Sequence, residues 1–284
     1  MKLPLMRIII AIFRLICLFF VTLFWFTIGL ILAPFLSKQK YFHLVRLWAK
    51  STLMSIGATV TVIGDNKDDY QQPNCMVIAN HISWLDIPVV YITYAVGFVA
   101  RIEIKNWPVL GSLMNHAGTL FIDRSRKRDI LKVNQIVSKK LASGGTIGLF
   151  PEGETSDGTQ VLPFKAGLFE NAITTPNCQI IPLVIEYCDA SGKHTSQVTY
   201  AGEVTLYQTI KNTLLIDKLQ VKIHILPKVK AGAFANRKRL SNYIFNQINL
   251  HYNVAAGVQI PNNEEQLGSD QENLELVSPI KIKN

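Results

Sequence analysis

Residues 75–88 read CMVIANHISWLDIP, and the expected architecture follows from this stretch. It begins with a short apolar run, which is typical of a strand buried on both faces. Pro88 follows closely, and proline is favoured in the first turn of a helix, where its missing N–H is not needed. The stretch therefore predicts a strand that ends at Asn80 and a helix that begins near Asp86.

Two side chains that can take part in catalysis lie in the turn between these elements. His81 and Asp86 are five positions apart. A helix turns ~100° per residue, so inside one straight helix they would point ~140° apart, and they can meet only if Asp86 begins the helix. An aspartate on one ring nitrogen fixes the tautomer and leaves the other nitrogen free to take a proton. On this short pattern alone, a histidine that merely closes the turn is the simpler interpretation.

The rest of the chain alternates between strand-like and helix-like patterns. Further strand candidates are residues 58–64, 97–101, 118–124, 146–152, 179–187 and 219–227. Helical periodicity is clearest in residues 127–141 and 236–252. The alternation predicts an α/β fold, with a mixed sheet flanked by helices.

Polar residues gather where three strand candidates end. His81 follows the strand that is predicted to end at Asn80, and Arg124 ends the candidate 118–124. Glu152 and Gly153 lie at the end of the candidate 146–152. In open α/β sheets, ligand sites lie at the carboxyl ends of strands, so we expect these residues to share one edge.

Residues 15–36 form a long apolar run without a charge. About 20 apolar residues are enough to cross a hydrocarbon core of ~30 Å, so one interpretation is a single spanning helix. Another is a helical hairpin that dips into one leaflet and is broken near Gly29 or Pro34. Its second arm, residues 41–56, would then share an apolar face formed by Leu44, Leu47, Trp48, Leu53 and Met54. A buried core helix is the third interpretation.

The composition favours a protein with anionic partners. Hydrophobic residues make up 49% and charged residues 17%, and the formal net charge is +9. A basic protein attracts lipid headgroups, phosphorylated substrates or nucleic acid. The basic residues are dispersed and no aromatic–basic RNA-binding pattern occurs, so we expect no nucleic-acid partner. The four cysteines form no C-x-x-C pair, which predicts reduced thiols and no metal site.

Four blocks in order resemble the glycerophospholipid acyltransferase family, in particular its bacterial 1-acyl-sn-glycerol-3-phosphate (lysophosphatidic acid) acyltransferases. The blocks are NHISWLD at 80–86, GTLFIDR at 118–124, FPEG at 150–153 and IIPLVI at 180–185. They match the family's N-H-x-x-x-x-D, G-x-x-F-I-D-R and F-P-E-G blocks and its proline-containing strand. The resemblance covers roughly residues 59–228 and the N-terminal membrane element.

The resemblance implies transfer of a fatty acyl chain from an acyl thioester, acyl-CoA or acyl-ACP, to a lysophospholipid. The acceptor would be the free sn-2 hydroxyl of 1-acylglycerol-3-phosphate and the product phosphatidic acid, with no cofactor and no metal. Carried over by position, His81 is the general base and Asp86 orients it. Arg124 binds the acceptor phosphate, because a guanidinium grips phosphate through two parallel donors. Read without the family, Arg124 forms a surface salt bridge with Asp123 or Asp129.

Glu152 and Gly153 correspond to the family's acceptor-binding block, and Lys165 supplements the phosphate clamp. The alternatives are a structural hydrogen bond or helix cap for Glu152 and a solvated side chain for Lys165. The family reads E-G-T-R-S where residues 152–156 read EGETS, so an arginine is missing and an acid is added. A less anionic acceptor, such as lyso-ornithine lipid or a lysophosphodiester, is therefore an alternative. A non-catalytic membrane lipid-binding protein is the alternative from another class.

We expect three regions along the chain. Membrane-anchoring helices occupy residues 1–57, the α/β acyltransferase domain residues 58–258, and a disordered acidic tail residues 259–284. The expected partners are membrane lipids, the lysophospholipid acceptor and the acyl carrier. The expected location is a membrane, in a bacterium the inner membrane, with the catalytic domain facing the cytoplasm.

Overall fold

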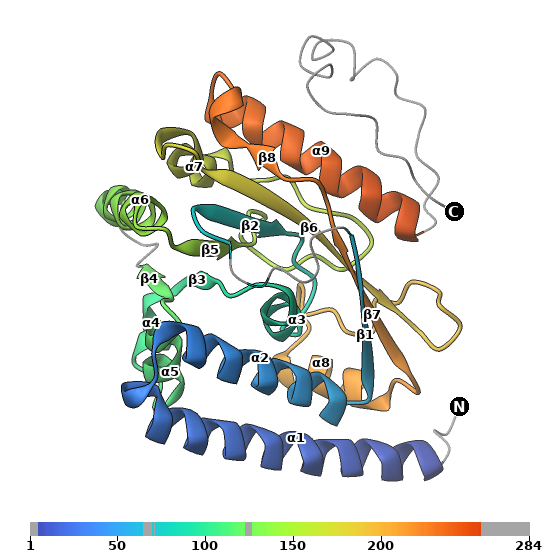
Figure 1. The fold of residues 1–284 in the computed structure, drawn as a ribbon. Helices are drawn as coiled ribbons and strands as arrows, with labels where there is room; N and C mark the ends of the chain where they lie inside the picture. The colour runs from blue at the N-terminus through green and yellow to red at the C-terminus, as the bar shows by residue number, and fades with distance from the viewer. Residues whose placement is uncertain (1–4, 65–69, 71, 123–126, 257–284) are drawn as a thin grey trace.

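The computed structural model describes residues 5–64, 70, 72–122 and 127–256, with the backbone alone at 127–134. Arg124 and the predicted tail at 259–284 lie outside the described residues. Figure 1 shows a central sheet with helices on both faces. The expected α/β fold with a mixed sheet flanked by helices is confirmed.

The described residues build an eight-stranded sheet in the order β1-β7-β6-β2-β5-β3-β4, with β8 paired to β6. The strands are β1 Ala58–Ile63, β2 Cys75–Ala79, β3 Gly97–Arg101, β4 Leu120–Ile122, β5 Thr146–Leu149, β6 Gln179–Cys188, β7 Leu219–Ile225 and β8 Val229–Lys230. β2 lies between β5 and β6 and is parallel to both. β7 is antiparallel to β6 and parallel to β1, which makes the sheet mixed.

Every predicted strand run contains a strand, but two strands are shorter than the patterns. β4 covers three residues of 118–124, and β5 ends at Leu149 rather than at Glu152. Pro151 lacks the N–H that a strand ladder requires, so the chain leaves the sheet before it. This early exit frees Phe150 and the residues after it for the turn at the sheet edge.

Helices cover both faces of the sheet (Figure 1). α9 and α7 lie on one face, and α1, α2, α3 and α8 lie on the other, with α6 beside β5 and β4. The helices after the hairpin are α3 Asp86–Thr93, α4 Ile102–Lys105, α5 Leu110–His116, α6 Lys127–Ala142, α7 Glu170–Thr174, α8 Leu206–Leu215 and α9 Arg237–Ala256. α6 and α9 confirm the two helices predicted from periodicity.

The N-terminus forms the hairpin of the second interpretation. α1 spans Leu5–Leu32, a 3-10 turn spans Ala33–Phe35, and α2 spans Lys38–Ser55. The break lies at Pro34 and not at Gly29, which stays helical and packs closely against Leu113.

The five apolar residues predicted to share one face of α2 do not share one environment. Leu53 is 1% exposed, whereas Leu47 and Met54 are 54% and 74% exposed. α2 lies between α1 and α3 and buries a different set: Tyr41, Phe42, Val45, Ala49, Thr52 and Leu53. Because neighbours pack on two sides of α2, helical spacing alone could not identify the buried face.

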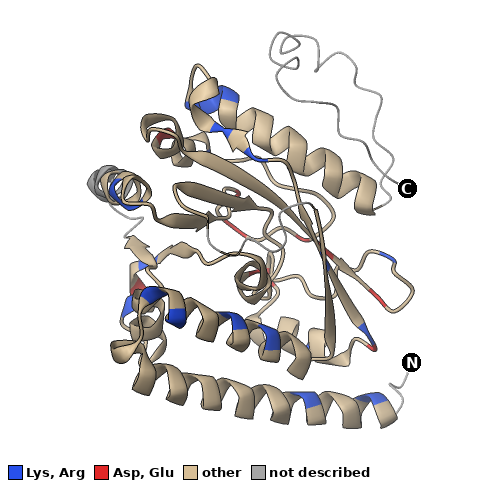
Figure 2. Ribbon diagram, viewed as in Figure 1, with Lys and Arg blue, Asp and Glu red and all other residues tan. Residues whose placement is uncertain are grey.

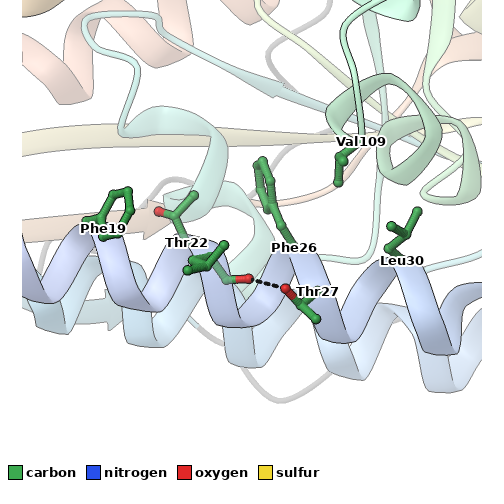
Figure 3. Close-up of a pocket in the computed structure, with 7 residues that line it drawn as sticks. Phe19, Thr22, Phe26, Thr27, Leu30 and Val109 are labelled. Atoms are coloured by element: carbon green, nitrogen blue, oxygen red, sulfur yellow. Dashed lines mark hydrogen bonds between the residues drawn. The ribbon is translucent and has the colours of Figure 1, made fainter.

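α1 is apolar and lies on the surface, which overturns the interpretation as a buried core helix. Within the described residues, Leu5–Phe35 is the helical segment long and apolar enough to cross a membrane. An 18-residue window of it has a mean hydropathy of 2.6 and is 6% buried. A groove of about 280 Å³ on α1 is lined by Phe19, Thr22, Leu23, Phe26, Thr27, Leu30 and Val109 (Figure 3). The exposed apolar surface indicates membrane association.

Candidate active site

The site begins where β2 ends in the middle of the sheet. The Asn80 side chain continues the ladder there: its Nδ2 donates to the Ile185 carbonyl oxygen at 2.9 Å, and the Ile185 N–H donates to its Oδ1 at 2.8 Å. Both bonds are buried, and buried amides need such partners. The side chain therefore ties the strand end to β6 and fixes where the following turn starts.

His81 and Asp86 meet across this turn as the spacing predicted. The distance from His81 Nδ1 to Asp86 Oδ2 is 2.7 Å. Asp86 is the first residue of α3 and is fully buried. Its Oδ2 also accepts the N–H groups of Ile82 at 2.7 Å and Ser83 at 2.9 Å. These donors stabilise a buried carboxylate that would otherwise be costly.

Tyr187 supports the same carboxylate from β6. Its hydroxyl donates to Asp86 Oδ1 at 2.6 Å, and the ring is fully buried. Burial and the Asp86 charge raise the pKa of Tyr187 well above its ordinary value, so the hydroxyl stays protonated and remains a donor. Tyr187 was not predicted as a site residue, although it lies within the predicted strand 179–187.

The second ring nitrogen of His81 is Nε2. With Nδ1–H on Asp86, Nε2 is left as the acceptor. The imidazole is 20% exposed, so it is reachable from solvent. One face of the ring stacks on Phe150, with centroids 4.1 Å apart and planes 12° apart. Phe98 stacks on Phe150 in turn, at 5.6 Å.

Glu152 lies beneath this turn instead of facing solvent. It is 2% exposed, and its two oxygens accept the N–H groups of His81 at 2.6 Å and Leu162 at 2.8 Å. Burial raises the pKa of Glu152 to about 8, although both backbone bonds oppose the rise. The geometry matches the structural hydrogen bond given as the alternative, because both oxygens hold backbone.

Gly153 and Lys165 lie together at the turn after β5. Gly153 has a φ of +80°, a conformation that glycine adopts without strain. A Cβ at this position would overlap the Lys165 ammonium group. Lys165 is exposed, and its N–H donates to the Pro151 carbonyl oxygen at 2.9 Å. The Lys165 ammonium group therefore lies over the turn that carries Glu152.

The segment that contains Val198 and Tyr200 is hydrogen-bonded to the turn that carries His81, and neither residue was predicted as a site residue. The Ser83 hydroxyl donates to the Val198 carbonyl oxygen at 2.7 Å, and the Tyr200 N–H donates to that of Ile82 at 3.0 Å. The Thr155 hydroxyl donates to the Tyr200 carbonyl oxygen. This segment links the His81 turn to the turn that follows Glu152.

A further cation ends β3 at the same sheet edge. Arg101 is exposed and pairs in register with Ile122 of β4, two residues before Arg124. Arg101 ends the strand candidate 97–101, so it could have been predicted at this edge in the same way as Arg124. Across the described part of the chain, no group of three His, Cys, Asp or Glu residues is placed to hold a metal ion.

Comparisons with known proteins show the family of this chain. The sequence profile of the Acyltransferase family matches residues 60–186. A 1-acyl-sn-glycerol-3-phosphate acyltransferase of Neisseria gonorrhoeae is 38% identical over 175 residues, covering 61% of this chain and 68% of the relative. A lyso-ornithine lipid O-acyltransferase of Rhizobium meliloti is 31% identical over 229 residues and 77% of each chain. The crystal structure of the 1-acyl-sn-glycerophosphate acyltransferase PlsC from Thermotoga maritima covers 90% of this chain and 100% of its own, with a TM-score of 0.69 at 18% identity.

Proposed function

We propose that this chain, which belongs to the acyltransferase family and is a glycerophospholipid acyltransferase, acylates the sn-2 hydroxyl of 1-acylglycerol-3-phosphate. The acyl donor is a thioester, acyl-CoA or acyl-ACP, and no cofactor takes part. The observation that carries the proposal is the His81–Asp86 contact of 2.7 Å on a partly exposed ring at the end of a central strand.

The chemistry follows from the two ring nitrogens of His81. Nε2 takes the proton of the acceptor hydroxyl as its oxygen attacks the thioester carbonyl carbon. The tetrahedral intermediate collapses, the carbon–sulfur bond breaks, and the imidazolium returns the proton to the leaving thiolate. Asp86 stabilises the imidazolium between these steps through the hydrogen bond at Nδ1. A base of this kind contributes about 10²–10⁴-fold in rate.

Cations at the sheet edge bind the acceptor phosphate in this proposal. Arg124 has this role by its place in the G-x-x-F-I-D-R block. Arg101 and Lys165 are the described cations at the same edge, and each offers charge-assisted donors to phosphate oxygens. Glu152 acts as a positioning residue, because it holds the backbone of His81.

A second candidate acceptor is lyso-ornithine lipid. Glu154 and Thr155 stand where the family's block carries threonine and arginine. Thr155 is uncharged and bonded to the backbone of Tyr200, so it offers nothing to a phosphate monoester. Relatives named lyso-ornithine lipid O-acyltransferase, including those of Rhizobium meliloti and Brucella abortus, favour this candidate.

We further propose that residues 1–57 anchor an α/β acyltransferase domain at residues 58–258 without crossing the bilayer. Arg14 of α1 donates to the carbonyl oxygens of Leu214 at 3.1 Å and Asp217 at 2.9 Å, at the end of α8. These bonds hold α1 along the body, so its apolar face meets one leaflet. The catalytic domain then faces the cytoplasm, and in a bacterium the membrane is the inner one.

An acceptor panel tests the function. Purified protein in detergent receives one acyl thioester and either lysophosphatidate, lyso-ornithine lipid or a lysophosphodiester, and free thiol is followed. We expect the highest kcat/KM with lysophosphatidate and no acceptor-dependent thiol with His81→Ala. A higher kcat/KM with lyso-ornithine lipid would replace the first acceptor by the second. Absence of acceptor-dependent thiol with every acceptor would instead support a non-catalytic lipid-binding protein.

A further inference from the structure

Two lysine side chains meet at the sheet edge opposite His81. Lys38 begins α2, and Lys140 lies in the last turn of α6. Figure 2 shows basic residues at the start of α2 and on α6. The two ammonium groups lie close enough for their charges to interact. Gly118 and Gly145, which contact Lys140, precede β4 and β5, so the pair lies at the amino ends of these strands.

Glycines shape the path of the Lys140 side chain. A Cβ at Gly145 would lie 2.9 Å from Lys140 Cγ, and a Cβ at Gly118 would lie 2.6 Å from Lys140 Nζ. The aliphatic part of the Lys140 side chain therefore passes over Gly145, and its ammonium group lies over Gly118. Lys140 is half-buried, and this burial together with the charge of Lys38 lowers the pKa of Lys140. The ammonium group is held in place, unlike that of an ordinary surface lysine.

Among the residues whose side chains the structure describes, no carboxylate forms an ion pair with Lys38 or Lys140. The Lys38 ammonium group lies 5.9 Å from the centroid of the Phe42 ring. Two neighbouring cations repel each other, and partial burial strengthens the repulsion. An anion between them would offset the repulsion and accept charge-assisted hydrogen bonds from both.

The position of the pair points to the membrane surface. Phe35 lies in the turn just before α2 and is 83% exposed. Trp107 lies two residues after the end of α4 and is 54% exposed. An interfacial helix buries its apolar face ~5–10 Å into the boundary of headgroups and acyl chains. Packed helices lie about 8–10 Å apart. If α1 lies in that boundary, a helix packed on its protein side lies about 8–10 Å closer to the water, at the depth of the lipid phosphates. α2 is such a helix, and Lys38 is its first residue.

We propose that Lys38 and Lys140 form an anion site that binds the phosphate of an anionic membrane lipid. The site is separate from the catalytic edge and does not depend on which acceptor is acylated. It fixes one end of the helical hairpin at the bilayer surface, in addition to the apolar contact made by α1.

Vesicle binding of the full chain tests the site. The lipids are phosphatidylcholine alone or mixed with phosphatidylglycerol, and the variants are Lys38→Gln, Lys140→Gln and the double variant. Lys40→Gln is the matched control, because Lys40 is an exposed lysine of the same helix. A lysine that only feels the surface potential contributes about fivefold in affinity. We expect each single variant at the site to lose more than about tenfold in affinity for the mixed vesicles. The double variant should bind these vesicles no more weakly than either single variant, because both lysines serve one ligand.

Three results would overturn the proposal. The first is additive losses of the size seen with Lys40→Gln, because these indicate general attraction and no shared ligand. The second is a loss with Lys140→Arg equal to that with Lys140→Gln, because Arg keeps the charge and the phosphate donors. The third is binding of inorganic phosphate to the wild type while phosphatidylglycerol adds nothing to vesicle affinity, because this would exclude a lipid ligand. The proposal itself predicts that inorganic phosphate competes with mixed vesicles only in the wild type. Melting temperatures of all variants control for folding.

Discussion

Replacing Tyr187 by phenylalanine should destabilise the protein although only one oxygen atom is lost. The hydroxyl donates to the buried Asp86 carboxylate at 2.6 Å, and no solvent can replace it. A hydrogen bond to a charged group contributes about 1.5–3 kcal/mol to stability. At about 2–4 °C per kcal/mol for a domain of this size, the melting temperature should fall by about 3–12 °C.

Tyr252→Phe is the matched control for this change. Tyr252 is also fully buried, and its hydroxyl donates to the Gly158 carbonyl oxygen at 2.5 Å. Because that acceptor is uncharged, the loss should be only about 0.5–1.5 kcal/mol. Thermal and urea unfolding of both variants in one detergent measure the difference. The difference reports the charge that Asp86 carries in the folded protein.

The same variant should leave the catalytic pair in place. Asp86 keeps its contact with His81 and its two backbone donors, so the geometry of the pair survives. Only the support of Asp86 from β6 is lost, so kcat should fall far less than in Asp86→Asn. Equal destabilisation by Tyr187→Phe and Tyr252→Phe would refute a Tyr187 bond to a charged partner.

Three further changes test other parts of the site. Asp86→Asn should lower kcat by about 10⁴-fold with little change in KM, because the amide favours the wrong tautomer; a loss below tenfold in steady-state kinetics would contradict this. Burial raises the pKa of Glu152 from 4.5 to about 8, so the folded state favours the protonated carboxyl group. The free energy of unfolding should therefore fall as the pH rises from 4.5 to about 8. The fall amounts to about 5 kcal/mol at 1.36 kcal/mol per pKa unit, and unfolding at several pH values should show it in the wild type and not in Glu152→Gln. Thr155→Arg restores the family's cation, so it should raise kcat/KM for lysophosphatidate by about tenfold and leave lyso-ornithine lipid unimproved, whereas equal effects on both acceptors would refute a role in headgroup choice.

Local sequence was enough to place the catalytic pair. His81 and Asp86 are separated by one turn, and Pro88 fixed where the following helix could begin. The 2.7 Å contact therefore follows from a strand end and a helix start that are adjacent in the chain. The same reasoning placed the strands and limited the break of the hairpin to Gly29 or Pro34, because apolar periodicity, glycine and proline act over a few residues.

The environment of the pair depends on contacts that no local pattern encodes. Tyr187 reaches Asp86 from 101 residues away because β2 lies beside β6. Glu152 turns inward because the chain leaves β5 early and both oxygens find backbone N–H groups. Periodicity and proline act over neighbouring residues and so placed each strand and turn. Which strands lie side by side, and which polar groups are buried between them, is set by packing of the whole chain, and that packing gives His81 its partners.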